Sequence, residues 1–494
     1  MTVITFHGGV GEIGGNKFIV EDGDTRILMD FGMSFSHEGK FFAEFVNARG
    51  SNYLNDMFAL GILPKIKGLY RRDYARHMGF DGREDTAFDA VLLTHAHVDH
   101  CAYIPYLRED IPIYCSEESN LIMRNFDETS TSQYITMKEK FRVKHNEKSG
   151  KYTRASGEET EIPRRIEVRR PRDKFSIGSI DVEMLPVDHS IPGVCALLLH
   201  TSSGTLANTG DLRFNGRRKM DTDGFVDRCA ESDLDLLLCE GTRVDVERSL
   251  TEADVETRVS RVLDATRELA VCTYPVRDLD RLLSIYNAAV ASNRHLVISL
   301  NQANLLDLFD RSEHTKGMYP SPTDKNVRIY LPRGSWSLID KDPGDFPDML
   351  PGDYGRLWQR RFLDYSNAID YRHVRDNQRD LVFFCSDFTL QDLIDVRPNP
   401  GSSYVRSSTE PFNEEMNLSS ARIMNWLVHF GLLKEGGKLE HFHISGHGDG
   451  PQIKGVIDGT RPKKLVPIHT EHPEYHQKWH KKTEVVKNGD SVAL

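Results

Sequence analysis

The stretch Thr94-His95-Ala96-His97-Val98-Asp99-His100 places three imidazoles and one carboxylate within six residues. It directly follows the apolar run Ala90–Leu93, which predicts a buried strand. The first two imidazoles share one side of the chain by their strand-like spacing, and the carboxylate and the third imidazole begin the next turn. Nitrogen and oxygen ligands without thiolate are typical of zinc, with manganese next. The stretch therefore predicts a site for divalent metal at the edge of a sheet.

The motif H-x-H-x-D-H after a strand resembles the metallo-β-lactamase superfamily. The resemblance implies an α/β fold, an αββα sandwich with a site for one or two metal ions. Asp30, at the end of an apolar run, matches the family's early Asp, which orients the metal-binding loop. His189 matches the third ligand of the first ion, and Asp211, in Thr-Gly-Asp, matches the carboxylate that bridges both ions. The flavodiiron branch carries Glu where His97 stands, so the motif favours hydrolysis over redox chemistry.

An α/β segment inserted between the third and last ligands resembles the β-CASP group of nucleases. Glu240, His447 and His469 match three markers of that group in chain order. A His at the third marker is typical of RNA-processing members, whereas DNA-directed members tend to carry an aliphatic residue there. The glycine-rich run Gly8–Asn16 and the loop Ser445–His447 are similar to those of the ribonuclease J family and its archaeal relatives.

The resemblance implies two divalent ions, with Zn²⁺ expected and Mn²⁺ or Mg²⁺ as alternatives. It implies that the first ion is held by His95, His97 and His189, that the second is held by Asp99, His100 and His469, and that Asp211 bridges them. Asp99 and Asp211 are the candidates to accept the proton of the attacking water. His447 is expected to hydrogen-bond the reacting phosphate or to protonate the leaving oxygen. Glu240 is expected to orient a metal-binding His.

Contacts to the substrate are expected outside this ligand set. Ser445 and the backbone of Gly446 match the pocket that binds a 5′-monophosphate in ribonuclease J. Ser407 and Ser408 are candidate donors to phosphate, with an ordinary polar loop as the equal alternative. Arg281, like Arg277 after the predicted strand Leu269–Tyr274, is a candidate contact to backbone phosphate, with a solvated arginine as the alternative.

The alternation of short β-like runs and helix-length segments predicts the domain organisation. Short β-like runs dominate residues 1–245, which we expect to form the first part of the metallo-β-lactamase domain. Strands that alternate with amphipathic helices, such as Leu279–Ser292 and Asn413–Gly431, fill residues 246–435 and predict a parallel sheet, the β-CASP domain. Two further strands, His441–Ser445 and Lys464–His469, fall in residues 436–494, which complete the first domain.

Two long polar segments, residues 37–88 and 124–175, do not fit this core. The second holds basic clusters at Lys138–Lys144 and Arg164–Lys174. Such runs are more often solvated surface than binding sites, although loops this long in a compact domain are usually functional or flexible.

Two further motifs do not indicate sites of their own. The motif G-x-G-x-x-G at residues 9–14 precedes a strand-like run and not a helix, so a dinucleotide site is not expected. His472, His476 and His480 align at helical spacing and predict a solvated or substrate-facing stripe.

Composition limits the class of protein. The chain has 494 residues, 28% of them charged, and a net charge of −11, which argues weakly against non-specific coating of nucleic acid. Its seven Cys are never spaced C-x-x-C, so we expect no disulfide framework and a reducing, cytoplasmic location. No run approaches the roughly 18 apolar residues of a membrane span, so no membrane partner is expected.

The sequence thus predicts a metal-dependent ribonuclease. We expect 5′-to-3′ exonuclease action on single-stranded RNA, with endonuclease action as an alternative, in RNA processing or decay, and a homodimer as one oligomeric state. Two other activities stay open, namely a β-CASP DNA nuclease in repair or defence and a small-molecule metallo-hydrolase. A binding subunit with an inactive site is disfavoured because every expected ligand is present.

Overall fold

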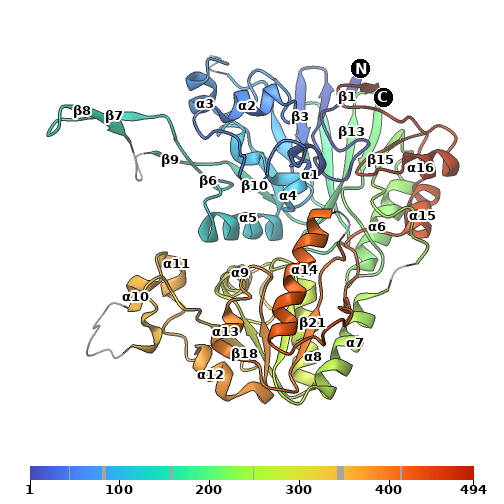
Figure 1. Ribbon diagram of the computed structural model, residues 1–494. Coiled ribbons are helices and arrows are strands. Elements are labelled where there is room, and N and C mark those ends of the chain that lie inside the picture. Colours follow the sequence, from blue (N-terminus) through green and yellow to red (C-terminus); the bar gives the residue numbers. More distant parts are fainter. Residues whose placement is uncertain (44, 81–84, 156–159, 249, 342–349, 412–413) are drawn as a thin grey trace.

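Two sheets packed face to face form the larger body of the protein (Figure 1). The computed structural model describes residues 1–494 except 44, 81–84, 156–159, 249, 342–349 and 412–413. The first sheet has the strand order β10-β5-β4-β3-β2-β1-β23. Its strands are β1 (Thr2–Phe6), β2 (Phe18–Asp22), β3 (Thr25–Met29), β4 (Ala90–Leu92), β5 (Ile113–Ser116), β10 (Ile166–Arg169) and β23 (Ser491–Ala493).

The second sheet has the order β11-β12-β13-β14-β15-β22. Its strands are β11 (Lys174–Ile177), β12 (Ile180–Pro186), β13 (Cys195–Thr201), β14 (Gly204–Asn208), β15 (Leu236–Cys239) and β22 (Lys464–Pro467). Strands β22 and β23 come from the end of the chain, and β23 pairs with β1, so the two termini lie close together (Figure 1). Residues 464–493 therefore complete both sheets.

The core between the sheets follows from the alternation of side chains along each strand. Ile27 and Met29 of β3 face the second sheet, and Leu28 between them faces the outer helices. Leu197 and Leu199 of β13 lie across the interface in the same buried cluster. This is the αββα sandwich that the sequence predicts.

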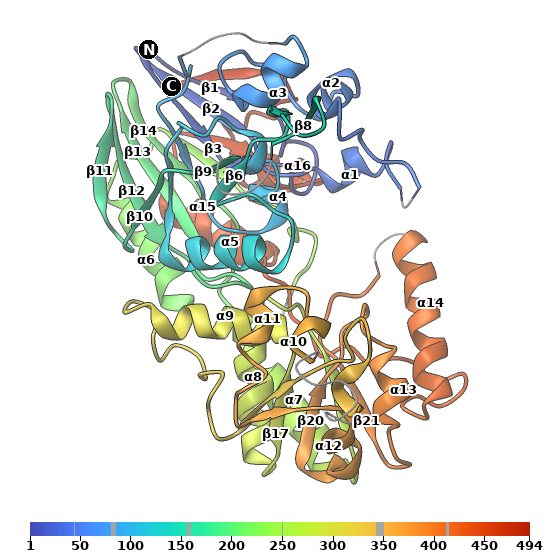
Figure 2. The same ribbon diagram turned by 90° about the vertical axis from the view of Figure 1, so that its left-hand side faces the viewer.

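Helices cover both outer faces of the sandwich (Figures 1 and 2). On the side of the first sheet these are α1 (Phe35–Glu38), α2 (Tyr53–Ala59), α3 (Arg72–His77), α4 (Val98–Cys101) and α5 (Glu117–Thr129). A short 3₁₀ helix, Ile104–Tyr106, follows α4. On the side of the second sheet these are α6 (Lys219–Ala230), α15 (Gly450–Thr460) and α16 (Pro473–Trp479). Two small hairpins, β6 (Thr136–Lys138) with β9 (Glu161–Pro163) and β7 (Val143–Asn146) with β8 (Lys151–Arg154), stand apart from both sheets.

A third sheet forms a second body below the sandwich in Figure 1. All its strands are parallel, in the order β19-β18-β17-β20-β16-β21. They are β16 (Ala270–Thr273), β17 (His295–Ile298), β18 (Val327–Tyr330), β19 (Ala368–Ile369), β20 (Leu381–Phe384) and β21 (Ser403–Arg406). The helices are α7 (Glu252–Ala265), α8 (Leu279–Ala291), α9 (Leu300–Arg311), α10 (Leu350–Asp353), α11 (Leu357–Arg360), α12 (Tyr371–Asp376), α13 (Asp392–Val396) and α14 (Glu414–His429), with 3₁₀ turns Leu338–Asp340 and Gln378–Asp380.

Most predicted elements are present with ends shifted by one to three residues. The predicted helix Asn413–Gly431 is α14, and its predicted first residue, Asn413, lies outside the described residues. One predicted strand is wrong: His441–Ser445 is irregular, and His441 makes only an isolated bridge to Arg406. Buried and less buried residues alternate here, with Phe442 and Ile444 in the core, because the segment crosses between the two bodies. The segment does not belong to a sheet.

Candidate metal centre

The predicted metal-binding stretch lies where β4 ends. The chain leaves the strand at Leu92, passes His95 and His97, and turns into α4 at Val98. His97 has an extended backbone and forms the N-cap of α4, which directs Asp99 and His100 to a different side from the two imidazoles before them. His189 and Asp211 follow the ends of β12 and β14 in the second sheet. Ends of strands from both sheets thus meet at one edge of the sandwich.

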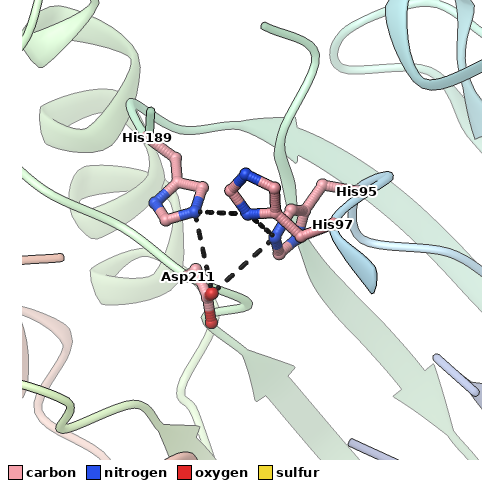
Figure 3. A group of neighbouring side chains, drawn as sticks. All are labelled: His95, His97, His189 and Asp211. Carbon is pink, nitrogen blue, oxygen red and sulfur yellow. Dashed lines mark hydrogen bonds and ion pairs between the residues drawn. The ribbon is translucent and has the colours of Figure 1, made fainter. Parts of the chain in front are cut away.

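The first group of candidate ligands comprises His95, His97, His189 and Asp211 (Figure 3). The Nδ1 atom of His97 lies 3.1 Å from Nε2 of His95 and 3.0 Å from Nε2 of His189. Oδ2 of Asp211 lies 3.7 Å from Nε2 of His95 and also of His189. One donor atom of each side chain therefore points at a common centre.

The second group comprises Asp99, His100, His469 and, again, Asp211. Nε2 of His100 lies 3.2 Å from Oδ2 of Asp211 and 3.9 Å from Oδ2 of Asp99. Nε2 of His469 lies 3.2 Å from the same oxygen of Asp99 and 3.7 Å from Asp211. The carboxylate of Asp211 thus belongs to both groups, which is the arrangement expected of a bridging ligand.

Two observations show that these residues fit divalent metal ions. Tetrahedral ligands with bonds of about 2.0–2.2 Å lie roughly 3.3 Å from one another, close to most of the distances above. Both carboxylate oxygens of Asp211 and Nε2 of His100 are also buried without a hydrogen-bond partner in the described part of the chain. A buried polar atom without a partner is costly, and a cation between the two groups removes that cost.

A second layer of contacts turns the ligand atoms toward the centre. Nδ1 of His100 lies 2.7 Å from Asp30, whose other contacts are to Thr94. Nδ1 of His189 donates to the carbonyl of Gly446 at 2.5 Å. Because Nδ1 of each ring is occupied, Nε2 is left to face the metal groups, which is the usual way that a ligating His is oriented.

The pKa values of the site follow from burial and from the excess of carboxylates. Burial lowers the pKa of His97 to about 4 and lowers those of His95 and His189 well below the usual value, so all three are neutral and keep a lone pair for a metal. Burial also disfavours charge on His100, but Asp211, with two other carboxylates, raises its pKa well above normal. That negative excess is what a divalent cation neutralises.

His447 and Glu240 lie beside the two groups. Nδ1 of His447 lies 3.0 Å from Oε2 of Glu240, and its Nε2 lies 3.9 Å from Asp211. Burial would lower the pKa of His447, but the carboxylates of Glu240 and Asp211 outweigh burial and raise the pKa to about 9. Glu240 thus contacts His447 and none of the seven predicted metal ligands, and its other oxygen accepts from the backbone N–H of Leu212.

The structure separates the predicted substrate contacts into two sets. Ser445 and Gly446 lie at the rim of the metal groups, since a Cβ on Gly446 would come within 2.5 Å of the His189 ring. The predicted role of Arg281 does not fit the structure, because its guanidinium is fully buried and pairs with Glu252 at 2.7 Å. Ser407 is buried too and accepts from Arg281 at 2.7 Å. Both residues also donate to the carbonyl of Phe442, in the segment that crosses between the two bodies.

Ser408 next to them is half-buried, and its hydroxyl has no hydrogen-bond partner in the described structure. It therefore stays a candidate donor.

Two features of the site were not predicted from the sequence. Thr242 places its hydroxyl 2.8 Å from Nδ1 of His469 and donates to the carbonyl of the same residue. His476, predicted to be solvated or substrate-facing, is instead buried, with Nε2 3.1 Å from the carbonyl of Glu240. A helix forms at this place, but only His476 lies within it, with His472 and His480 at its two ends, and the helix packs the His476 ring against the strand end that carries Glu240.

Comparison with known proteins agrees with this site. Residues 71–271 match the family model described as a beta-lactamase superfamily domain. Residues 437–485 match the model described as a Zn-dependent metallo-hydrolase RNA specificity domain. The chain therefore has the metallo-β-lactamase fold, and its His and Asp cluster could hold divalent metal ions.

The curated proteins most like this chain include ribonuclease J enzymes. The chain is 24% identical over 476 residues to ribonuclease J of Mycolicibacterium smegmatis, with 94% of this chain and 68% of the relative covered. It is 23% identical over 493 residues to ribonuclease J of Helicobacter pylori strain 26695, with 98% and 58% covered. The chain spans between about half and two thirds of the length of the first such relatives, from 53% to 68%.

A solved structure supports the fold over the whole chain. A protein of unknown function from Enterococcus faecalis V583 superposes with a TM-score of 0.70 at 22% identity and 100% coverage of both chains.

Across the described residues, we find no helix with the length and apolar character that a membrane crossing needs. All seven cysteines are free and buried.

Proposed function

We propose that this chain is a metal-dependent ribonuclease that hydrolyses RNA phosphodiester bonds from the 5′ end, with endonucleolytic cleavage as a second mode. The observation that carries the proposal is the sharing of Asp211 by two ligand groups. Two divalent ions bound by these residues would hold the phosphate oxygens and lower the pKa of an attacking water. The all-nitrogen-and-oxygen donor set favours Zn²⁺, with Mn²⁺ or Mg²⁺ as alternatives.

In this proposal the ligands divide as the two groups do. His95, His97 and His189 hold the first ion, and Asp99, His100 and His469 hold the second. Asp99 is the more exposed of the two carboxylates that face the second group, with 14% of its side chain accessible against 1% for Asp211. It is therefore the better placed to receive a proton from water at the open side of the site.

His447 acts on the leaving group. Glu240 holds its Nδ1 side, so the opposite ring nitrogen faces the centre beside Asp211. A donor fixed there hydrogen-bonds the oxygen that departs from phosphorus. Ser445 and the N–H of Gly446, on the same loop, bind the terminal 5′-phosphate and thereby set how far the chain of RNA enters the site.

Labelled RNA tests the proposal directly. RNA with a 5′-monophosphate, a 5′-triphosphate or a 5′-hydroxyl, labelled in turn at each end, is incubated with the protein, with chelator and with re-added Zn²⁺ or Mn²⁺. We expect mononucleotides to be released from the 5′ label of monophosphate RNA, and chelator to stop the reaction. Equal or faster hydrolysis of matched single-stranded DNA would replace ribonuclease with DNA nuclease, and turnover of a thioester or lactam alone would overturn both.

A further inference from the structure

The two long polar segments of the sequence, residues 37–88 and 124–175, assemble into one unit. Arg71, from the first segment, is 2% exposed and donates to the carbonyl of Lys138 in the second at 2.7 Å. The backbone N–H of Lys140 donates to Asp73 at 2.8 Å. The rings of His77 and Phe141 stack with centroids 3.8 Å apart. Side chains of the first segment thus hold the root of the second.

From this root a two-stranded ribbon, β7 and β8, projects away from the sandwich (Figure 1). We call residues 142–154 the arm. Every residue of the arm is exposed, and none belongs to a hydrophobic core cluster of the described structure. The ribbon is closed by a turn in which the side chain of Asn146 accepts from the N–H groups of Lys148 and Ser149. An isolated hairpin is marginally stable in water, so this anchored ribbon adds little to the stability of the fold.

The arm is strongly basic in an acidic protein. Its sequence RVKHNEKSGKYTR carries five basic residues and one acidic residue, a formal charge of +4, whereas the whole chain carries −11. Two rings also lie on it: Tyr152 is 75% exposed, and its centroid lies 5.2 Å from that of His145. Cations along a ribbon with an exposed aromatic ring match the backbone and the bases of a single-stranded nucleic acid.

We propose that the arm binds single-stranded RNA away from the metal centre, as a second contact for the substrate of the proposed ribonuclease. The inference rests on that proposed function. The arm is not expected to bind the arm of a second copy of this chain, because that contact would bring two ribbons of charge +4 together. The acidic body is expected to repel RNA, so a basic arm concentrates the affinity for the backbone in one place.

A charge-reversal experiment tests the arm. Lys148→Glu, Lys151→Glu and Arg154→Glu are combined in one variant. The control combines Lys481→Glu, Lys482→Glu and Lys487→Glu, which are exposed, change the net charge equally and follow α16 on the far side of the molecule from the arm (Figure 1). Binding of a fluorescent, unstructured RNA is measured by anisotropy at several salt concentrations with chelator present, so that binding is read without cleavage.

We expect the arm variant to bind RNA roughly tenfold more weakly than the control, and its slope of log K against log salt to fall by about 2, since each lost phosphate contact removes roughly 0.7. Tyr152→Ala should weaken binding with the salt slope unchanged. Equal affinities and slopes for the arm variant and the control would overturn the arm proposal. So would a loss of oligomer in sedimentation with RNA binding intact, which would assign the arm to a protein contact.

Cleavage is measured separately on a chromogenic phosphodiester too small to reach the arm. We expect the arm variant to keep the activity of the unmodified protein on it. The two proposals can fail separately. If RNA binding depends on the arm but the unmodified protein does not cleave RNA with metal present, the arm proposal stands and the proposed ribonuclease activity is wrong.

Discussion

Oε2 of Glu240 lies 3.0 Å from Nδ1 of His447, and the carboxylate is fully buried. The pair contributes none of the ligands that the sequence predicts, although Glu240 and His447 also lie close enough to His469 to form a third group of possible ligands. Glu240→Gln keeps the size of the side chain but loses the charge that orients the imidazole. We expect kcat to fall about 10–100-fold, the usual effect of losing an orienting partner, with metal content unchanged.

His447→Ala should cost more than the loss of its partner, about 10²–10⁴-fold in kcat, because it removes the donor itself. The measurement is single-turnover cleavage together with metal analysis of each purified variant. Wild-type rates in His447→Ala would assign this residue a structural role.

Asp211 should be needed for both ions, whereas the other ligands each serve one. Asp211→Asn removes the charge from a carboxylate that contacts both groups, so we expect the metal content to fall from about two ions to fewer than one and cleavage to be lost. His97→Ala should spare the second ion, and Asp99→Ala should spare the first. Inductively coupled plasma mass spectrometry measures the stoichiometry, and circular dichroism shows whether each variant is folded. Full cleavage activity in both His97→Ala and Asp211→Ala would contradict the two-metal mechanism.

Arg281 should stabilise the second body and its contact with Phe442, in the segment that crosses to the sandwich. Its guanidinium pairs with the buried carboxylate of Glu252 and donates to Ser407. Arg281→Ala leaves Glu252 buried without its partner, so we expect a loss of about 3–5 kcal/mol in the free energy of unfolding. Urea denaturation measures the loss. Unchanged stability with a reduced salt dependence of RNA binding would restore the phosphate contact that the sequence suggested.

The same ion pair predicts a pH dependence. Burial would raise the pKa of Glu252, but Arg281 outweighs burial and lowers the pKa to about 2. A lowered carboxyl pKa contributes stability above the unfolded pKa, near 4.3, and loses it as pH falls toward 2. The difference in stability between the wild type and Glu252→Gln should therefore be constant from pH 6 to 9 and smaller by about 0.6 kcal/mol at pH 4. A difference that grows on acidification would mean that Glu252 is not held ionised by Arg281.

The sandwich and the convergence of the ligands were expected because short local motifs carry the resemblance to the metallo-β-lactamase superfamily, and the resemblance implies both. A strand that ends in H-x-H-x-D-H has few alternatives, and Asp30 and Asp211 follow apolar runs of their own. The errors concern residues whose surroundings come from distant parts of the chain. Arg281 is indistinguishable from a solvated arginine until Glu252, nearly thirty residues earlier, is brought against it.

The contact between Thr242 and His469 could not be predicted for the same reason. The two residues are 227 positions apart, and no periodic pattern in the sequence indicates that they are in contact.

The glycine-rich turn offers a matched pair of substitutions for the second ion. Gly14 and Gly11 both have a positive φ, +76° and +67°, so alanine at either position costs about 1 kcal/mol or more of backbone strain. They differ in what a Cβ would contact. At Gly14 it would lie 2.7 Å from Cβ of Asp99 and 2.9 Å from its Oδ2, whereas at Gly11 there is nothing within 4 Å.

Gly14→Ala should therefore displace Asp99, whose carbonyl is already held by the N–H of Gly15 at 3.0 Å and leaves little room for adjustment. We expect about one ion in place of two, and a fall in cleavage of about 100-fold, the size of effect that a misplacement of about 1 Å produces. Gly11→Ala should lose stability alone and keep both ions. If the two variants retained equal metal and equal activity, the glycines would serve only the turn, and the close approach at Gly14 would have no part in holding the second ion.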